Sequence, residues 1–548
     1  MKYLNLLLLL AIFSAHTSSG QAWKVYPYSE AGTLLSFPAD EGAHPVETTE
    51  WRYTVAHVTG DITGNEYSYM LTYFAYDTTL GGLTFDGFRI FNLANETTGE
   101  FFPETLPVTY DTLAETHLQI NAVSGFVTNE SWETKKDTLG NLVPFEYHIE
   151  ATSASGALSI DYAAMKRPLI VGDTGFFYQG INDYTYYYSQ TALDVSGSLT
   201  IDGFTETVTG LAWIDRQWGN FNPSSGEKYE WFCMQLDNGM DFNIWNIFNA
   251  ANEVPDTSTY TMCSIYHDSV TSSSNSSFKL ERLKYVFTSD TVQCYSQQWR
   301  YTYQDIDLLM TTIHDNTEVQ MPFRFYEGSI DVSGTVGGVP VTGVGFAELL
   351  HSYSHPNLQI DGPSVGGEWD GTQSVSWTVL DTDEGRPLSF DLAYSTDGIT
   401  YTDIATGISD MNYAWDLSGL WETECWLRLK GYSIDNTLSS ELKMSSSFTV
   451  GPVTGVENIS SGKLGVVVTP NPFSDLVQIQ VRSGDVNFEN LEILNSLGQM
   501  VQTVSATNKG AYSWNGKNSN GEQVPSGVYY YRLKTANGIA NGKMMYLK

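Results

Sequence analysis

Positive charge is scarce in this sequence. Its 548 residues include 27 Lys and Arg against 63 Asp and Glu, which gives a formal net charge of −36. An acidic surface repels both the phosphate backbone of nucleic acids and the anionic headgroups of lipids. The charge balance therefore argues against a nucleic-acid partner and against anionic membranes as the main target.

Cysteine is also rare, with four residues in the whole chain. Four cysteines are too few to hold a protein of this size together as a disulfide scaffold. Cys263 and Cys294 could pair in an oxidising compartment. Two free buried thiols fit the sequence equally well, because a sequence does not give the geometry that a disulfide needs.

Long hydrophobic runs are absent except for one near the N-terminus. Residues 6–13 are apolar, Lys2 precedes them, and the small residues Ser18, Ser19 and Gly20 follow. This order is typical of a secretory signal peptide over residues 1–20. The run is shorter than a bilayer requires, although a membrane anchor is the alternative interpretation. No cysteine lies near the cleavage region, which argues against a lipoprotein, so we expect an exported protein.

Familiar catalytic and metal-binding motifs are missing as well. The chain has no G-x-S-x-G elbow, no P-loop and no H-E-x-x-H sequence. His267, His314 and His351 each stand alone, so a metal site is not indicated. We expect neither a metal nor a cofactor, and no pattern in the sequence indicates an oligomeric state.

Aromatic residues and glycine, by contrast, are abundant: aromatics make up 14% of the chain, and there are 48 Gly. Residues 21–356 show almost no helical periodicity but many strand-like stretches, such as residues 51–58 and 67–76. The pairs Asp202-Gly203 and Asn238-Gly239 favour tight hairpin turns. Many antiparallel strands predict closed barrels, which have no exposed edges. Two barrels fit this length, and we expect them over residues 21–195 and 196–356.

Two smaller modules are predicted after the barrels, which makes the expected fold class all-β throughout. Residues 363–450 carry short strands separated by turn signals, as in an immunoglobulin- or fibronectin III-like sandwich, and we interpret this module as a spacer. Residues 463–548 follow a Gly/Ser-rich joint and combine short strands with Gly, Asn and Pro turns, which predicts a small antiparallel β-sandwich.

The C-terminal module carries three specific segments, TPNPF at 469–473, LGQ at 497–499 and VPSGVYYYRL at 524–533. Together they resemble the type A sorting domain of the type IX secretion system of Bacteroidota. The resemblance implies that the secretion machinery is a partner and that the protein crosses the outer membrane. The domain would then be removed, leaving the protein at the cell surface or in the medium. A carbohydrate-binding sandwich is the alternative.

A second resemblance lies in the body of the chain. The segments that carry it are SFPADEGAHP at 36–45, EWRYTVAH at 50–57, VTGLAWIDRQWG at 208–219, EWFCMQLDNG at 230–239 and VGFAEL at 344–349. This series is similar to the AttH/CrtC-like family, which includes carotenoid 1,2-hydratase (hydroxyneurosporene synthase). The resemblance covers most of residues 30–355 and implies two lipocalin-like β-barrels side by side. Some members add water to isolated double bonds of terpenoids, and many have no known reaction.

The sequence departs from the family pattern at two places. The usual EWWY is Glu50-Trp51-Arg52-Tyr53 here, and the usual D-H-x-W-G is Asp215-Arg216-Gln217-Trp218-Gly219. Both departures replace an aromatic ring with a cation. They weaken a direct transfer of hydratase activity to this chain.

Hydration of an unactivated alkene needs an acid that protonates carbon, groups that stabilise a carbocation, and one held water. A carboxylic acid kept neutral in an apolar pocket can supply the proton. Asp215 is the candidate acid, because Trp213 and Trp218 lie close to it in the sequence. Arg216, if it lay close to Asp215, would instead keep that carboxyl ionised. An ionised Asp215 could not protonate an alkene.

Other candidate site residues follow from the same chemistry. In strand geometry one face carries Trp51, Tyr53 and His57, and the other carries Glu50 and Arg52. Aromatic faces stabilise cations, and an imidazole can hold a water. The candidates for the aromatic wall are Trp51, Tyr53, Trp213, Trp218 and Trp231. Beside Asp215, the candidates for catalysis are Glu50 and His57. The candidates for further ligand contacts are His44, Arg216 and Glu348.

Each candidate also has a purely structural interpretation. Glu50 and Arg52 could form an ion pair at a barrel end, Asp215 and Arg216 could join the two barrels, and the tryptophans could fill the core. Three functions therefore stay open. The first is binding, with hydration or isomerisation, of an apolar isoprenoid- or lipid-like molecule. The second is a non-catalytic surface or adhesion protein with filled barrels. The third is a glycan hydrolase whose carboxylates, among Glu50, Asp215 and Glu348, converge on a cleft.

Overall fold

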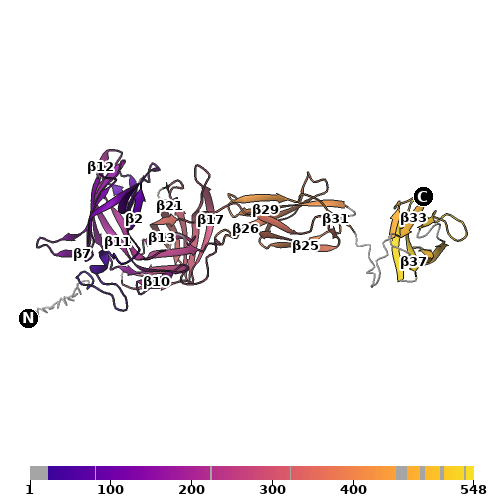
Figure 1. The fold of residues 1–548 in the computed structure, drawn as a ribbon, viewed down its shortest axis with the longest axis horizontal. Helices are drawn as coiled ribbons and strands as arrows, with labels where there is room; N and C mark the ends of the chain where they lie inside the picture. The colour runs from indigo at the N-terminus through magenta and orange to yellow at the C-terminus, as the bar shows by residue number, and fades with distance from the viewer. Residues whose placement is uncertain are drawn as a thin grey trace, which may run out of the picture. The chain divides into compact units, whose positions relative to one another are not determined.

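The computed structural model describes eleven ranges of the chain, within which almost every regular element is a β-strand (Figure 1). These ranges are 22–80, 82–126, 128–221, 225–268, 270–320, 323–420, 423–451, 466–481, 488–505, 511–535 and 538–548. The predicted signal peptide and the Gly/Ser-rich joint lie outside them. The 3₁₀ turn Ala39–Glu41 is the sole helical element in these ranges. No helix there has the length and apolar character to cross a membrane. The all-β prediction is confirmed.

The first sheet closes into a barrel. Ten strands follow the order β11-β12-β1-β2-β3-β4-β5-β6-β7-β8, and β8 pairs back with β11. The short strands β9 and β10 pair with the N-terminal part of β11. The strands are β1(Thr49–Gly60), β2(Glu66–Leu80), β3(Leu83–Asn95), β4(Glu100–Leu113), β5(Gln119–Ser124), β6(Thr128–Lys136), β7(Leu142–Thr152), β8(Gly156–Ala164), β9(Leu169–Ile170), β10(Phe176–Gln179), β11(Asp183–Ile201) and β12(Phe204–Asn220).

The first barrel extends further along the chain than the expected boundary at 195/196, which falls inside β11. The reason is the hairpin at Asp202-Gly203, where both residues have positive φ values of 49° and 78°. A tight hairpin joins neighbouring strands of one sheet, and Ile201 is paired directly with Phe204. The second sheet therefore begins only at Lys228.

The second sheet is a half-barrel with the order β16-β15-β14-β13-β22-β21-β19-β18-β17, and β20 pairs with β21. Its predicted hairpin at Asn238-Gly239 joins β13 to β14, and Gly239 has a φ of 87°. The strands are β13(Lys228–Leu236), β14(Asp241–Phe248), β15(Thr261–Tyr266), β16(Ser272–Asn275), β17(Lys279–Phe287), β18(Cys294–Tyr303), β19(Ile306–Thr312), β20(Glu318–Val319), β21(Phe325–Val336) and β22(Val339–Leu349).

Strand β1 shows how the two sheets divide the side chains between them. Alternate residues of a strand point to opposite faces. Ala56 and Val58 belong to the packed interior of the first barrel, whereas Tyr53 and Val55 belong to a cluster that also contains Trp231 of the second sheet. The interior of the first barrel is thus filled by side chains, and the outer face of β1 contacts the half-barrel. The predicted division of β1 into two faces is confirmed.

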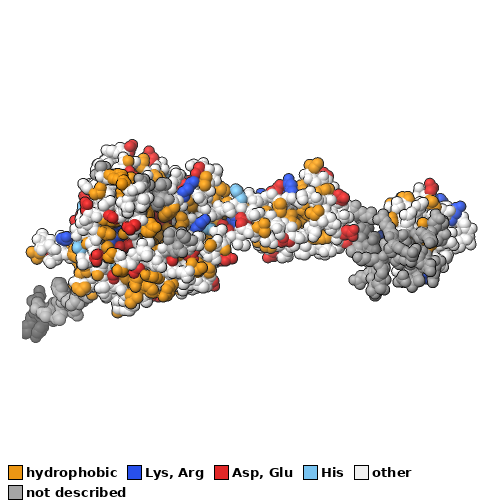
Figure 2. All heavy atoms as spheres, viewed as in Figure 1, with side chains coloured by type: hydrophobic (Ala, Val, Ile, Leu, Met, Phe, Trp, Pro, Cys, Tyr) orange, Lys and Arg blue, Asp and Glu red, His pale blue; other side chains and the backbone are white. Residues whose placement is uncertain are grey.

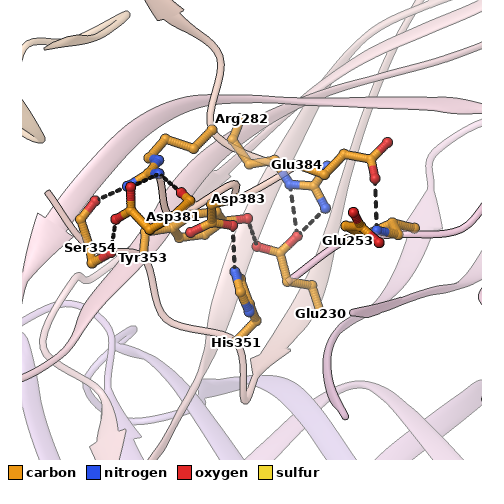
Figure 3. A network of polar contacts seen from close by, with 12 residues as sticks. Glu230, Glu253, Arg282, His351, Tyr353, Ser354, Asp381, Asp383 and Glu384 are labelled. Atoms are coloured by element: carbon orange, nitrogen blue, oxygen red, sulfur yellow. Dashed lines mark hydrogen bonds and ion pairs between the residues drawn. The ribbon is translucent and has the colours of Figure 1, made fainter. Parts of the chain in front are cut away.

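A buried polar network connects the half-barrel to residues 379–391, which belong to the same compact unit as both sheets (Figure 3). Glu230 accepts hydrogen bonds from Arg282 Nε at 2.9 Å and from the Tyr353 hydroxyl at 2.9 Å. His351 stacks on Phe248 at 3.6 Å, and its Nε2 lies 3.0 Å from Asp383 Oδ1. We assign this network a structural role, because every charged group in it has a partner in the protein.

The third module, interpreted from the sequence as a spacer, consists of two sheets, and its first strand begins at Leu358, before the expected start at residue 363. One has the order β23-β25-β28, and the other has the order β24-β31-β29-β26-β27, with β30 beside β29. The strands are β23(Leu358–Gly362), β24(Glu368–Trp369), β25(Thr372–Val379), β26(Leu388–Ser395), β27(Thr402–Ile408), β28(Asn412–Asp416), β29(Thr423–Ser433), β30(Ser439–Lys443) and β31(Phe448–Val450).

The C-terminal module is a small sandwich of two sheets, β32-β33-β36 and β35-β34-β37-β38. Trp514 and Tyr531 lie in its core. The strands are β32(Val466–Thr469), β33(Val477–Val481), β34(Phe488–Leu494), β35(Met500–Val504), β36(Ala511–Trp514), β37(Gly527–Thr535) and β38(Gly538–Tyr546).

The four cysteines are buried as free thiols. Cys263 and Cys294 are therefore unpaired, and the alternative of two separate thiols is the one observed. The acidic composition is visible on the surface: Figure 2 shows acidic side chains spread over the visible face, with few Lys and Arg among them.

Candidate functional site

A pocket of about 620 Å³ lies between the outer face of the first barrel and the half-barrel. Strands β1, β2, β3, β11 and β12 form one wall, and β13, β14, β21 and β22 form the other. Its volume is in the range of small-molecule sites. The lining is mainly aromatic and includes Trp51, Tyr53, Phe74, Phe88, Tyr187, Tyr229, Trp231, Trp245 and Phe325. Lys228 is the single cationic residue among the described lining residues.

Asp215 of β12 lies in the wall of this pocket and is 3% exposed. Its Oδ2 accepts a hydrogen bond from the Tyr187 hydroxyl at 2.5 Å, and its Oδ1 accepts one from Trp213 Nε1 at 2.7 Å. Burial raises the pKa of Asp215 to about 7, although these hydrogen bonds favour the ionised form. Burial therefore favours the neutral carboxyl over a pH range in which an exposed aspartate is ionised.

The hydroxyl of Tyr187 has a defined direction. Trp231 Nε1 donates to the Tyr187 oxygen at 3.1 Å, and Asn243 Nδ2 donates to it at 2.7 Å. Because two N–H groups occupy the oxygen as an acceptor, the Tyr187 proton points to Asp215. The carboxyl is thereby held in one orientation by groups from both sheets.

A pair of glutamates lies on the opposite wall. Glu348 of β22 lines the pocket and is the register partner of Glu327 in β21. The Tyr53 hydroxyl donates to Glu327 at 2.8 Å, and the Tyr229 hydroxyl donates to Glu348. The two glutamates are direct cross-strand neighbours, and Oε2 of Glu327 has no hydrogen-bond partner among the described residues.

Burial dominates the electrostatics of this pair. It raises the pKa of Glu348 to about 7 and that of Glu327 well above its usual range. Two adjacent carboxyl groups cannot both ionise in a buried site. We therefore assign the proton to Glu327 and the negative charge, when present, to Glu348.

Five of the residues predicted from the sequence line the pocket: Trp51, Tyr53, Asp215, Trp231 and Glu348. Trp213 lies behind Asp215 and acts through its hydrogen bond to that carboxyl. His57 is not among the lining residues. Its Nε2 lies 3.1 Å from the carbonyl oxygen of Gly345, and its ring packs on Phe346. His57 therefore does not hold a water in the pocket.

The remaining predicted residues lie inside the first barrel. Glu50 is 3% exposed, and its Oε1 is 2.7 Å from Arg216 Nη2 and 3.3 Å from Arg52 Nη2. His44 Nδ1 lies 2.9 Å from Glu50 Oε1, and the His44 ring stacks on the Trp218 ring with centroids 3.9 Å apart. None of these side chains lines the pocket. Each one either points into the first barrel from its strand or contacts a side chain that does. The predicted ion pair of Glu50 with Arg52 is present.

The two departures from the family pattern meet in this cluster, since Arg52 and Arg216 are register partners across β1 and β12. Arg216 would keep Asp215 ionised only if it lay close to that carboxyl, and the structure does not meet this condition. Consecutive residues of a strand point to opposite faces, and Arg216 pairs with Glu50 instead. Glu50 does not line the pocket, whereas Asp215 and Glu348 both do, so two of the three carboxylates considered for a glycan hydrolase share one pocket.

Sequence reasoning missed Glu327, Tyr187 and Tyr229 as site residues. Glu327 had only a weak signal, because it is one of two acids in β21, with Asp331, whereas Glu348 is the lone acid of β22. The two tyrosines had none, because their role depends on which carboxyl faces them from another strand. Within the described ranges, no group of three or more His, Cys, Asp or Glu side chains is placed to hold a metal ion.

The raised pKa of Asp215 predicts an unusual pH dependence of stability. A carboxyl whose pKa rises on folding, here from 3.8 to about 7, stabilises the fold fully below the unfolded value. That contribution is lost as the pH rises through about 7. We expect the free energy of unfolding to fall between about pH 4 and 8 more steeply in the wild type than in Asp215→Asn, by a few kcal/mol. Urea denaturation across this pH range measures the difference, and parallel curves would contradict a buried neutral Asp215.

Comparison with known proteins gives the following results. A sequence model described as AttH-like matches residues 28–353, and one described as the FlgD Ig-like domain matches residues 474–538. A crystal structure assigned to AttH of Nitrosomonas europaea is 20% identical and covers 60% of this chain and 99% of its own, with a TM-score of 0.49. Kievitone hydratase of Nectria haematococca is 16% identical and covers 60% of this chain and 98% of its own, with a TM-score of 0.46. No curated protein sequence matches the chain.

Proposed function

The chain belongs to the AttH-like family, and from this premise we propose that its pocket binds an apolar, isoprenoid- or lipid-like molecule and that Asp215 acts on it as a general acid. The observation that carries the proposal is the pair of acids, Asp215 and Glu348, in one aromatic pocket, each with a pKa of about 7. Structural carboxylates on a protein surface are fully ionised at neutral pH. Perturbed acids in a cleft are instead typical of functional sites.

The pocket supports an apolar ligand by its size and its lining. Its volume of about 620 Å³ accommodates a drug-sized molecule. Stacked rings such as Phe74 and Phe88, with centroids 4.3 Å apart, offer a flat apolar wall. Besides Asp215 and Glu348, the lining includes polar residues such as Gln179, Asp183, Gln217, Glu227 and Lys228, which would orient the polar end of a ligand that is otherwise apolar.

The chemistry we propose is hydration of a carbon–carbon double bond. The neutral Asp215 carboxyl transfers its proton to one alkene carbon, and the ring faces of Trp231 and Trp51 stabilise the resulting cation. A water oxygen then bonds to the cationic carbon while Glu348, as the ionised member of its pair, accepts a proton from that water. The product is an alcohol. Tyr187 and Trp213 stabilise the carboxylate left on Asp215, because both already donate hydrogen bonds to it.

The same residues support isomerisation if a proton leaves the carbon skeleton before water adds. Glu348 would then take that proton, and the double bond would shift. The alternative of a non-catalytic protein with filled barrels accounts for the packed interior of the first barrel. It does not account for the aromatic pocket with two perturbed acids outside that interior.

Ligand binding is testable without knowing the substrate. We expect the mature protein, purified from a lipid-rich lysate, to show a retained apolar ligand in native mass spectrometry that organic extraction removes. The extracted protein should then bind members of a panel of terpenoids and fatty acids. Trp51→Ala removes part of the pocket wall and should weaken that binding about tenfold.

The matched control is Trp426→Ala, which removes a partly exposed tryptophan from β29 of the spacer module. It should leave the affinity unchanged. An extracted protein that binds no member of the panel, or an equal loss of affinity in both variants, would refute the proposal.

A further inference from the structure

Glu348 lines the large pocket, here called the front pocket, whereas Glu327 lines a second, much smaller cavity, here called the back cavity. Its volume of about 10 Å³ has room for about one water molecule. Strands β2, β3, β21 and β22 supply most of its wall. Among the lining residues are Asn92, Glu96, Glu327 and Ser329. Glu96 and Glu327 therefore both line a space that has room for about one water molecule.

Asn92 is the residue that points to an occupant. Its side chain is 3% exposed, and neither its Nδ2 nor its Oδ1 has a hydrogen-bond partner among the described residues. A buried amide without partners is costly, and such groups in proteins are usually satisfied by ordered water. Because Asn92 lines the cavity, one water there would satisfy a donor and an acceptor of the same side chain.

Glu96 connects the cavity to the surface. Its Oε1 accepts hydrogen bonds from Ser68 and Ser329, each at 2.5 Å. Its Oε2 lies 3.1 Å from His314 Nε2, and the His314 side chain is 24% exposed. A titratable group in contact with solvent therefore touches a carboxylate that faces the cavity.

We propose that a water in this cavity links Glu96 to Glu327 and that protons pass between solvent and the Glu327–Glu348 pair by this route, entering or leaving at His314. Each transfer is a set of concerted hops. One O–H bond of Glu327 breaks as the cavity water gains a proton, and the water passes another of its protons to Glu96, which passes one to His314. The reverse order imports a proton, and no other reactant is needed.

The route has a use only in the context of the proposed function, on which it rests. When Glu348 has taken a proton from the attacking water, both members of its pair are protonated. An apolar ligand fills the front pocket at that moment and excludes solvent from it. A path at the back lets Glu327 release the extra proton while product still fills the front pocket, and Asp215 regains a proton from solvent once the product has left.

The test measures proton access to Glu327 without any ligand. Infrared spectroscopy detects the C=O band of a protonated carboxyl, and this band shifts when its hydrogen is replaced by deuterium. The full chain carrying Glu348→Gln is used, because this change cuts the path from the front pocket. The band is assigned to Glu327 by its loss in Glu327→Gln. The rate of the shift after transfer to D₂O, at mildly acidic pH, then reports exchange by the back route.

We expect fast exchange in Glu348→Gln alone. Adding Asn92→Leu, which fills the cavity, should slow the shift at least about tenfold, since exchange would then require local opening of the sheet. Adding His314→Gln, a change at a partly exposed site, should slow it too. Asn121→Leu is the matched control, because Asn121 lies on the outer face of β5, and it should change nothing.

Unchanged exchange in both the Asn92 and the His314 variants would overturn the route. If Asn92→Leu does not fold, the His314 variant and a crystal structure of the wild type still decide the matter. That structure should show an ordered water within hydrogen-bond distance of Asn92, Glu96 and Glu327, and an empty cavity would contradict the proposal. Failure of the protein to bind any apolar ligand would refute the proposed function alone, because proton access is measured without one.

Discussion

Asp215→Asn is expected to lower turnover of the pocket's ligand by about a thousandfold while leaving the ligand bound. General acid catalysis contributes about 10²–10⁴ in rate. The protonation of carbon is the step that depends most on it, and in the proposed scheme Asp215 supplies this proton while Glu348, the other buried acid of the pocket, accepts one from water. Asn has nearly the same shape as Asp but no proton to give. Turnover of the bound ligand, followed by product analysis, gives the rate, and titration of the same ligand gives the affinity.

The hydrogen bonds of Asp215 also indicate how an asparagine at position 215 would be oriented. Its carbonyl oxygen can accept the hydrogen bond that Tyr187 donates to Asp215, whereas its amide faces the Trp213 N–H and loses that bond. We therefore expect a small loss of stability, of about 1–3 kcal/mol, and a folded protein. Asp194→Asn on the exposed face of β11 is the matched control and should retain full activity. Full turnover in Asp215→Asn would assign the proton donor to the glutamate pair.

Glu50→Gln is expected to have the largest effect on stability. Arg52 and Arg216 are each 1% exposed, and Glu50 contacts both guanidinium groups. Without the negative charge of Glu50, the buried guanidinium groups of Arg52 and Arg216 lie side by side. Breaking a buried ion pair by removing one partner costs about 3–5 kcal/mol, because a charge stays buried without compensation. Urea denaturation followed by circular dichroism measures the change.

The control for this prediction is Glu100→Gln, an exposed carboxylate of β4 whose hydrogen bond comes from Thr98. Its effect should stay within about 0.5 kcal/mol. Combining Glu50→Gln with Arg52→Met and Arg216→Met should recover part of the lost stability, because buried ionic groups can be replaced by apolar ones of similar volume. Equal stability of Glu50→Gln and wild type would mean that Glu50 does not stabilise the two buried arginines.

Much of the architecture followed from local patterns. Alternation along β1 correctly separated Trp51 and Tyr53 from Glu50 and Arg52, since side chains of a strand alternate whatever the strand packs against. Asp202-Gly203 and Asn238-Gly239 correctly predicted hairpins, because the positive φ of Gly203 and of Gly239 is a local property. The domain boundary depended on strand pairing over longer range, and there the expected division at 195/196 cut a strand that belongs wholly to the first barrel.

The candidate site was predictable only in part. Asp215 could be identified because it is an acid between tryptophans, and the structure places it in the pocket. His57 and Arg216 had comparable sequence signals, but His57 packs beside Gly345 and Arg216 faces the barrel interior. Residues of a sequence motif are neighbours along the chain, and in a strand consecutive neighbours point to opposite faces. The residues of a site must share one face. The signal peptide and the sorting domain stay predictions, the first because it lies outside the described residues.

The sequence by itself determined that this is an acidic all-β protein of the AttH-like type and which residues of each strand share a face. Those properties depend on composition, on the two-residue period of a strand and on turn residues, all of which are local. Only the tertiary structure decided that the pocket lies between the sheets, that Glu327 joins Glu348, and that Glu50 pairs with both Arg52 and Arg216. Each of these results joins strands that are far apart in the chain, and burial, which sets the pKa of a carboxyl, exists only after those strands have packed.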